Sequence, residues 1–500
     1  MTTPPGADPS TPLCEIVLHG ITPGRISPTG PLTDPGWYPG RAGEVVLRAT
    51  PLGVRPLAWR RIAGVVHLAR HSSVLARLAP RASLDMNALT RLSRRDFPTG
   101  GGWFTGVHRV PGGTETRLEA SGTAGEPARW FRMLPEPGPG EVEPDVLELV
   151  IAACGRSLEG RRRAAVMLSG GIDSSVVALA AAEASRRAGL PPPVLLSATY
   201  PELACDERRF QDAVALRLGL DQIRVDGTVV PLWPSLEAAV AWHGAPLIDG
   251  QEEINLRLYR AAGEQGCDLV FAGIGGDEMF EGRGLEVDLL RRGHWRRALR
   301  LIGSTIEARP RPRLRTYLRR AVRIPLQPGR LGVTHEAARR FGTWCRARLD
   351  RTLADAGLDW RLEMAARTAA RAGLTLSAPF LEEPFVTTFG GVSWDRLAGS
   401  GTVKSLLREA VRGKLPQPVV ERVLKADFAP YYEARLDRDL PALTAAYDRL
   451  YRTHRMEGLP PTITPLLKPP FSSERFLTAW MSLTILLLVE AWPSSIRSSP

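Results

Sequence analysis

The pattern of hydrophobic and polar positions changes at about residue 145. Beyond it, short apolar runs alternate with longer stretches of helical periodicity, which is typical of βαβ units around a parallel sheet. The helix after Ser174 has an apolar face and is expected to end at Gly189. The expected strands are 164–168, 193–200, 221–227 and 268–273. This part of the chain is therefore predicted to have an α/β fold.

The chain before residue 145 has a different composition. Residues 1–133 are rich in Gly, Pro and short β-type runs such as EIVLHGI and GEVVLRAT. Six of the 11 residues in 134–144 are Pro or Gly, which is a linker signature. Beyond about residue 285 the pattern is mostly helical. The sequence predicts a domain over 1–133, a linker over 134–144 and a second domain over 145–500.

One apolar stretch, Phe476 to Trp492, resembles a membrane span at first sight. It is short for a bilayer and carries Glu490, so a buried terminal helix is expected instead. The five cysteines are scattered and form no C-x-x-C pair, and the N-terminus has no basic stretch followed by an apolar core. We expect reduced thiols, a cytoplasmic location, and neither a membrane nor a nucleic acid as partner.

The positive charge is concentrated in one segment. The chain has 65 basic and 53 acidic residues, a net charge of +12. Residues 291–330 contain 13 Arg and one acid, Glu307, so this segment alone accounts for the surplus. Only four basic residues are Lys: Lys404, Lys414, Lys425 and Lys468. In so Arg-rich a chain, a surviving Lys hints that a compact ammonium is needed.

The strongest chemical signal is the run SGGIDSS, which follows an expected strand and opens a helix. Its glycines allow a tight turn whose N–H groups can face a phosphate, and the new helix presents its positive end to an anion. An acid inside such a loop requires a cation such as Mg²⁺ between it and the phosphates. The simpler alternative is an ordinary strand–helix turn. The nucleotide-binding candidates here are Ser169, Gly170, Gly171, Asp173, Ser174 and Ser175, with Ser197 on the next strand.

SGGIDSS resembles the pyrophosphate-binding loop of the N-type ATP pyrophosphatases. A second motif, GIGGDEMFEG at 273–282, also follows an apolar strand and resembles the GxGxDExFxG signature of the asparagine synthetase branch. The resemblance implies a parallel-sheet ATP-pyrophosphatase domain that uses ATP and Mg²⁺. It further implies that Asp173 and Asp277 share the metal and act in catalysis, and that Gly273 and Gly275 lie at the nucleotide.

Other segments are similar to the same branch. They are Ala245 to Asn255, Ser377 to Glu382, Lys404 to Arg408 and Glu421 to Phe428. The family's second Lys stabilises the anionic transition state and pyrophosphate, and by position Lys425 inherits this catalytic role. For Lys404, a functional role and a helix surface charge both stay open.

The region 1–133 resembles the family's N-terminal glutaminase without its nucleophile. Trp103 to Gly113 is similar to the F-x-GI-x-x-x-PG end of that domain, yet residue 2 is Thr and the first Cys is Cys14. We therefore expect a degenerate α+β glutaminase-like domain. Without glutamine-derived ammonia, the nucleophile must be an amine on the substrate. β-Lactam synthetases and lasso-peptide macrolactam synthetases, two offshoots of the branch, work in this way.

The position of Ile274 bears on the choice. β-Lactam synthetases carry a Tyr there and asparagine synthetases an acid, whereas Ile cannot take a proton. The base for the attacking amine is therefore open, with Asp249 and Glu278 as candidates on chemical grounds.

The resemblance implies an ATP-dependent, AMP-forming amide ligase, and most specifically a lasso cyclase that adenylates an acidic side chain of a precursor peptide. A leader-peptide recognition protein and a leader peptidase would then be partners. The Arg-rich segment is expected to contact the peptide or a partner that delivers it. The alternatives for this segment are solvated helix faces, subunit contacts and nucleic-acid binding. The alternatives are an ammonia-dependent asparagine synthetase-like enzyme, a β-lactam synthetase-like enzyme, a tRNA-modifying pyrophosphatase and an inactive nucleotide-binding scaffold.

Overall fold

The structure is a computed structural model. It describes residues 19–21, 36–39, 44–50, 56–98, 100–119, 124–131, 144–233, 235–248, 250–308, 333–422, 426–468 and 472–492. The linker expected over 134–144 lies outside these ranges except for Pro144, as does residue 309 onward in the Arg-rich segment. The proposed domain boundaries stay a prediction.

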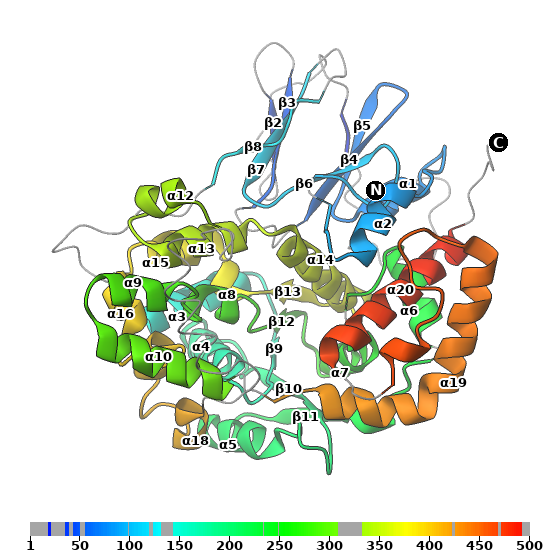
Figure 1. Ribbon diagram of the computed structural model, residues 1–500. Coiled ribbons are helices and arrows are strands. Elements are labelled where there is room, and N and C mark those ends of the chain that lie inside the picture. The colour runs from blue at the N-terminus through cyan, green and yellow to red at the C-terminus, as the bar shows by residue number, and fades with distance from the viewer. Residues whose placement is uncertain are drawn as a thin grey trace.

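A parallel sheet of five strands forms the centre of the molecule, with the order β11-β10-β9-β12-β13 (Figure 1). Its strands are β9 (Ala164–Met167), β10 (Val194–Thr199), β11 (Gln222–Asp226), β12 (Leu269–Phe271) and β13 (Thr375–Ser377). The first four were expected from their apolar runs, and the α/β prediction is confirmed. The fifth, β13, was not expected, because its three residues TLS carry no strand pattern of their own.

Alternate residues of each strand face opposite layers of helices. In β9, Ala164 and Val166 join one hydrophobic core and Ala165 joins the other. The first core contains α3 (Val146–Leu158) and α4 (Ile172–Arg187), and the second contains α7 (Glu252–Glu264) and α14 (Ala356–Arg371). The sheet is therefore covered on both faces, which is why β9, β10 and β12 are mostly apolar.

Strand β9 lies between β10 and β12. The chain adds β10 and β11 on one side of β9 and then β12 and β13 on the other side, so the strand order reverses at β9. Loops that leave the carboxyl ends of β9 and β12 consequently meet at one edge, where parallel α/β sheets place their ligand sites. Helix α4 begins at Ile172, two residues before Ser174, with Gly171 as its N-cap. The end of the SGGIDSS run is thus the first turn of a helix and not a free loop.

The chain up to residue 131 forms two antiparallel sheets, with the orders β1-β5-β4-β6 and β2-β3-β7-β8. A core that includes Leu47, Trp59 and Leu68 draws on strands of both sheets. Helix α1 packs on the first sheet and α2 contacts the C-terminal helix α20 (Ser473–Ala491), which agrees with the expected α+β region. The elements are β1 (His19–Ile21), β2 (Trp37–Pro39), β3 (Val45–Arg48), β4 (Leu57–Ile62), β5 (Val65–Ala69), α1 (Ser72–Arg77), α2 (Met86–Ser93), β6 (Val107–Val110), β7 (Thr114–Leu118) and β8 (Ala128–Arg129).

The remaining helices surround the parallel sheet. The C-terminal helix α20 (Ser473–Ala491) is buried along most of its length, as expected. Within the described ranges, no helix has the length and apolarity needed to cross a membrane. The others are α5 (Arg208–Leu218), α6 (Ser235–His243), α8 (Gly276–Phe280), α9 (Leu285–Arg291), α10 (Trp295–Ala308), α12 (His335–Arg340), α13 (Trp344–Leu353), α15 (Glu383–Phe389), α16 (Trp394–Ala398), α17 (Ser405–Ala410), α18 (Gln417–Glu421) and α19 (Ala429–His454).

Candidate active site

The two glycine-rich turns after β9 and β12 touch one another. A Cβ atom on Gly273 would lie 3.0 Å from the backbone nitrogen of Ser174, and one on Gly276 would lie 2.5 Å from Cγ of Asp173. Neither position has room for a side chain, so the glycines of the second motif are required for the first motif to pack against it. Gly275, at φ +95°, is the N-cap of α8 and lies against Leu381 of the Ser377–Glu382 segment.

The first turn is held by its own serines. The Ser174 and Ser175 hydroxyls donate to the carbonyl of Gly171, at 3.1 and 2.8 Å, and the Ser169 and Ser174 hydroxyls lie 3.0 Å apart. Gly170 adopts φ +86°, a left-handed conformation that bends the chain from β9 into α4. The turn therefore presents the positive end of α4 at the edge of the sheet, which is the arrangement expected for binding phosphate.

Ser197 does not belong to this turn between β9 and α4. Its side chain is fully buried, donates to the carbonyl of Leu168 at 2.9 Å and accepts from Gln222 at 2.8 Å. These bonds link β9, β10 and β11. A contact between Ser197 and a nucleotide, expected from its strand position alone, stays a prediction that this burial does not support.

A buried lysine joins the two motifs. The Lys404 ammonium bonds Oδ1 of Asp277 at 2.6 Å and also bonds Asp173, and the residue is only 3% exposed. Burial by itself would lower the pKa of Lys404, but the two carboxylates outweigh burial and raise it above the usual value. Lys404 is therefore a cation at the centre of the site, and the alternative of a helix surface charge is wrong.

Two hydrogen bonds hold the backbone of Val403, the residue before Lys404. The Val403 N–H donates to the Ser304 hydroxyl of α10 at 3.0 Å, and the Val403 carbonyl accepts from Arg408 at 2.9 Å. Lys404 itself has φ +59°, an uncommon conformation for a residue with a side chain. Such a conformation persists only where neighbours over-determine it, and Ser304 and Arg408 provide that support.

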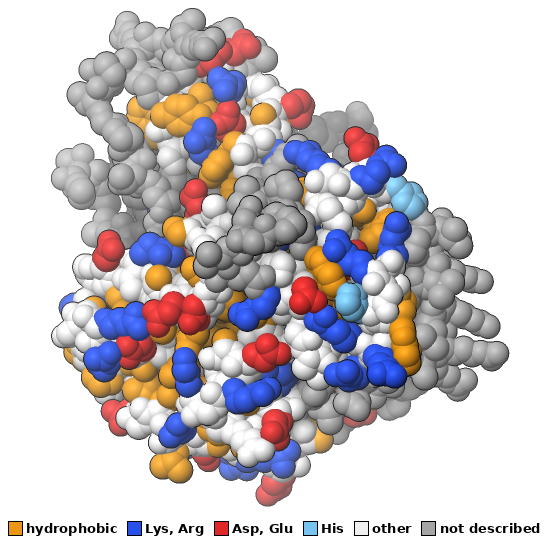
Figure 2. Space-filling view, turned by 90° about the vertical axis from the view of Figure 1, so that its left-hand side faces the viewer, with side chains coloured by type: hydrophobic (Ala, Val, Ile, Leu, Met, Phe, Trp, Pro, Cys, Tyr) orange, Lys and Arg blue, Asp and Glu red, His pale blue; other side chains and the backbone are white. Residues whose placement is uncertain are grey.

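The described part of the Arg-rich segment contributes to the same support. Arg297 of α10 pairs with Asp395 at 2.5 Å, and Arg300 donates to the Ser400 carbonyl at 2.9 Å. Both contacts hold α10 against the segment that leads to Lys404. On the side of the molecule where α9, α10 and α12 lie, basic side chains are interspersed with acidic ones (Figure 2). Binding of a peptide by residues 291–330 stays a prediction.

Two residues expected at the site fall outside the described ranges. They are Lys425, the inherited catalytic lysine, and Asp249, a candidate base. Arg422, three positions before Lys425, is described: it forms an ion pair with Glu207 and stacks on the ring of Phe210 at 4.2 Å. The predicted role of Lys425 stays a prediction.

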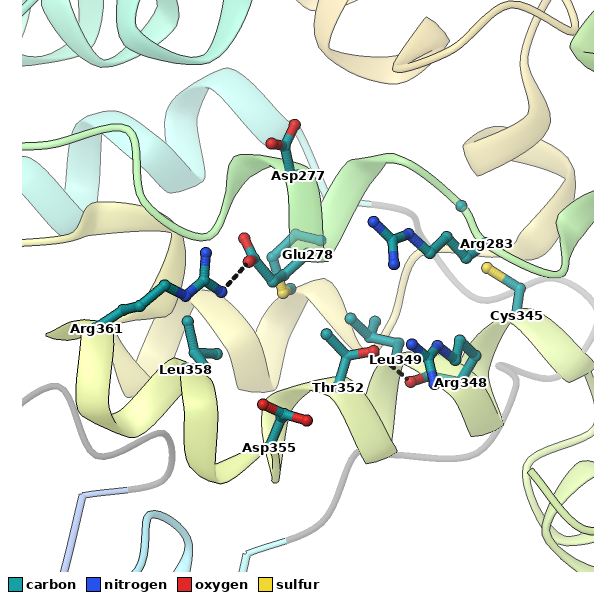
Figure 3. Close-up of a pocket in the computed structure, with 12 residues that line it drawn as sticks. Asp277, Glu278, Arg283, Cys345, Arg348, Leu349, Thr352, Asp355, Leu358 and Arg361 are labelled. Carbon is teal, nitrogen blue, oxygen red and sulfur yellow. Dashed lines mark hydrogen bonds and ion pairs between the residues drawn. The ribbon is translucent and has the colours of Figure 1, made fainter. Parts of the chain in front are cut away.

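The other candidate base, Glu278, points into a cavity of about 300 Å³ between α8, α13 and the start of α14 (Figure 3). There it accepts a hydrogen bond from Arg361 at 2.8 Å, while Asp277 points away from the α13 and α14 helices. Ile274 packs against the hydrophobic core. Consecutive residues of α8 thus have different partners: Asp277 bonds Lys404, and Glu278 bonds Arg361.

The donor set at the site suits Mg²⁺ only in part. Among the described residues, no cluster of three or more His, Cys, Asp or Glu could hold a metal. Mg²⁺ commonly binds one or two carboxylates together with substrate phosphates, and Asp173 and Asp277 fit that pattern. The metal would neutralise charge on the phosphates, and Lys404 would have to release part of its contact with the acids.

Two phosphate-type turns after neighbouring parallel strands, each with one acid and joined by one lysine, define a nucleotide-dependent α/β enzyme site. The family profile for asparagine synthase matches residues 145–468. The chain therefore belongs to the asparagine synthase family, and the family indicates an ATP-dependent amide ligase that adenylates a carboxylate. Enzymes of this family use ATP, typically with Mg²⁺. No curated protein sequence matches the chain.

Proposed function

We propose that this ligase closes a macrolactam ring in a peptide, as a lasso-peptide cyclase does. A side-chain carboxylate of the peptide attacks the α-phosphorus of ATP, which releases pyrophosphate and leaves an acyl adenylate. The N-terminal amine of the same peptide then displaces AMP and loses a proton to a base. The peptide loses one water in total, and each ring consumes one ATP.

The observation that carries this proposal is a polar cavity next to the charged centre, with Asp277 belonging to both. Asp277, Lys404 and Asp173 form a charged centre suited to a nucleotide, and Glu278 lies in a separate polar cavity next to it. A peptide in that cavity can bring its carboxylate to the nucleotide while its amine approaches Glu278.

Each residue has a distinct part in this scheme. The first turn of α4 and Lys404 would bind the phosphates. Asp173 and Asp277 would hold the Mg²⁺ ion that neutralises part of the phosphate charge. Glu278, oriented by Arg361, accepts the proton of the attacking amine. Ring closure gains most of its acceleration from positioning, because both reacting groups belong to one bound molecule. A leader-peptide recognition protein and a leader peptidase would deliver the peptide and free its N-terminal amine.

The test uses purified protein, Mg²⁺-ATP, the precursor peptide encoded beside its gene and the partner proteins found there. Peptide mass and AMP are followed together. Loss of one water with an equal amount of AMP supports the proposal, and Asp173→Ala should abolish both signals. AMP formation from aspartate with free ammonia, and no change in any peptide, would favour an asparagine synthetase-like enzyme instead. A folded protein that forms no AMP with any acceptor would be a nucleotide-binding scaffold.

A further inference from the structure

Charged side chains of both signs line the cavity beside Glu278. Three arginines line it, namely Arg283, Arg348 and Arg361, against the acids Glu278 and Asp355 and the neighbouring Asp277. Lys404 already bonds Asp277. Arg361 pairs with Glu278 and Arg283 pairs with Glu281, so the lining offers charged donors and carboxylate acceptors that can bond the polar groups of a peptide.

A second cavity, of about 570 Å³, lies along a neighbouring face of the same helix. Cys345, Arg348, Leu349 and Thr352 of α13 line the first cavity, and Ala347, Asp350, Arg351 and Ala354 line the second. Each set recurs at intervals of three or four residues, so each occupies one stripe of the helix. Helix α13 therefore separates the two cavities along most of its length.

The two cavities share one lining residue, Asp355, which follows the C-terminal end of α13. The far wall of the second cavity is supplied by the N-terminal region through Arg95, Phe97 and Arg129. Arg129 also pairs with Asp350 of α13 at 2.7 Å, which fastens that wall to the helix. The second cavity thus lies between the N-terminal region and Asp355, and the first lies between Asp355 and Glu278.

We infer that the two cavities together bind one extended peptide. Its reacting amine and acidic side chain lie in the first cavity, and the residues that follow them lie in the second. This inference rests on the proposed function and names its substrate class: a peptide that continues beyond its ring-forming part. Both volumes fall in the range of roughly 300–1,000 Å³ of sites that enclose ligands of drug size. A free amino acid would need only the first cavity.

The inference also assigns a function to the N-terminal region, which lines the second cavity. Arg95, Asp96 and Arg129 present charged groups to the second cavity, and the main chain and polar side chains of a peptide can bond such groups. The N-terminal region would then contribute to binding because it forms one wall of the second cavity.

The test compares two fluorescently labelled peptides, the full core peptide and one truncated directly after the ring-forming acid. Ala354 is exposed at the rim of the second cavity, so Ala354→Trp narrows that cavity without burying the new ring in the core. Ala445, exposed on α19, provides the matched control Ala445→Trp. We expect the wild-type and control proteins to bind the full peptide about tenfold more tightly than the truncated one, and Ala354→Trp to lose this advantage.

A second variant addresses the first cavity. Thr352→Trp places a ring between Glu278 and Asp355, and should weaken the binding of both peptides at least tenfold. If Ala354→Trp and the wild type prefer the full peptide equally while rings still form, the two-cavity inference is overturned and the proposed function stands. If the wild-type protein binds neither peptide and closes no ring, the proposed function fails and the inference fails with it.

Discussion

The ammonium nitrogen of Lys404 lies 2.6 Å from Oδ1 of Asp277 and is also hydrogen-bonded to Asp173. These acids follow two different strands, so one side chain holds the ends of β9 and β12 in register at the site. The contact places three charges within bonding distance before any nucleotide binds. Mg²⁺ held by these two acids would replace part of the Lys404 contact, and the ammonium would then be placed next to the phosphates.

Removal of the Lys404 ammonium should be the most damaging single change near the nucleotide. Lys404→Met leaves Asp173 and Asp277 facing each other without a cation, and we expect the rate of ATP–pyrophosphate exchange to fall by about 10²-fold or more. Lys404→Arg should not restore it, because a planar guanidinium needs more room than this buried space offers. The matched control is Lys414→Met at an exposed position, which should exchange pyrophosphate at the wild-type rate. Normal exchange in Lys404→Met would remove Lys404 from the site.

Gly276→Ala tests the close approach of the two motifs. The new Cβ would lie 2.7 Å from Cβ of Asp173, an atom too near the backbone to move freely, so Asp173 must shift. We expect stabilisation by Mg²⁺-pyrophosphate, measured as a rise in melting temperature, to disappear in this variant. The control is Gly303→Ala in α10, where a Cβ meets nothing within 4 Å and alanine is the better helix former. A full ligand-induced rise in Gly276→Ala would contradict the packing described here.

The sequence was sufficient to predict four strands of the parallel sheet but not β13. Strands β9, β10 and β12 are apolar runs buried on both faces, and their pattern is visible in the sequence alone. Strand β13 is three residues long and partly exposed, and it forms by pairing with β12, about 100 positions earlier. Its stability comes from that distant pairing, so no local pattern marks it.

The residues of the site also fall into two groups, those that the sequence was sufficient to predict and those that it left open. Asp173 and Asp277 were expected to converge because both follow parallel strands at one edge of a sheet. The role of Lys404 was left open because its neighbours in sequence are those of an ordinary helix start. Its burial depends on Asp173 and Asp277, which lie 231 and 127 positions away. The scarcity of lysine was the one local signal, and it did not separate Lys404 from the exposed Lys414.

Ser304→Ala tests whether α10 positions Lys404. The Ser304 hydroxyl accepts from the Val403 N–H at 3.0 Å, and its loss leaves a partly buried donor next to Lys404 without its partner. One such bond is worth about 1 kcal/mol, so we expect a several-fold fall in kcat with little change in the KM for ATP. Thr305→Ala is the control on the same helix, because the Thr305 hydroxyl bonds only to Leu301 of α10 in the described structure. Equal effects of the two variants would show that α10 acts only through its general stability.

Asp359 provides a prediction about pH and the junction with the N-terminal region. It is a buried residue of α14 and accepts a hydrogen bond from the Gly112 N–H at 3.1 Å. Burial raises the pKa of Asp359 to about 6, although Arg109 acts in the opposite direction. The folded state therefore holds a proton that the unfolded chain has lost between about pH 4 and 6, and stability falls as pH rises through that window.

Asp359→Asn removes the charge and keeps an oxygen that can accept from Gly112. We expect the variant to exceed the wild type in unfolding free energy at pH 7.5, by at most about 3 kcal/mol, and the difference to vanish below about pH 4. Urea unfolding at both pH values measures this. His71 has the opposite effect, since burial lowers its pKa to about 4, but it is present in both proteins and cancels in the comparison. Asp221→Asn, whose side chain is 90% exposed, should match the wild type throughout. If Asp359→Asn is no more stable than the wild type at pH 7.5, ionisation of Asp359 does not destabilise the folded protein and the prediction is wrong.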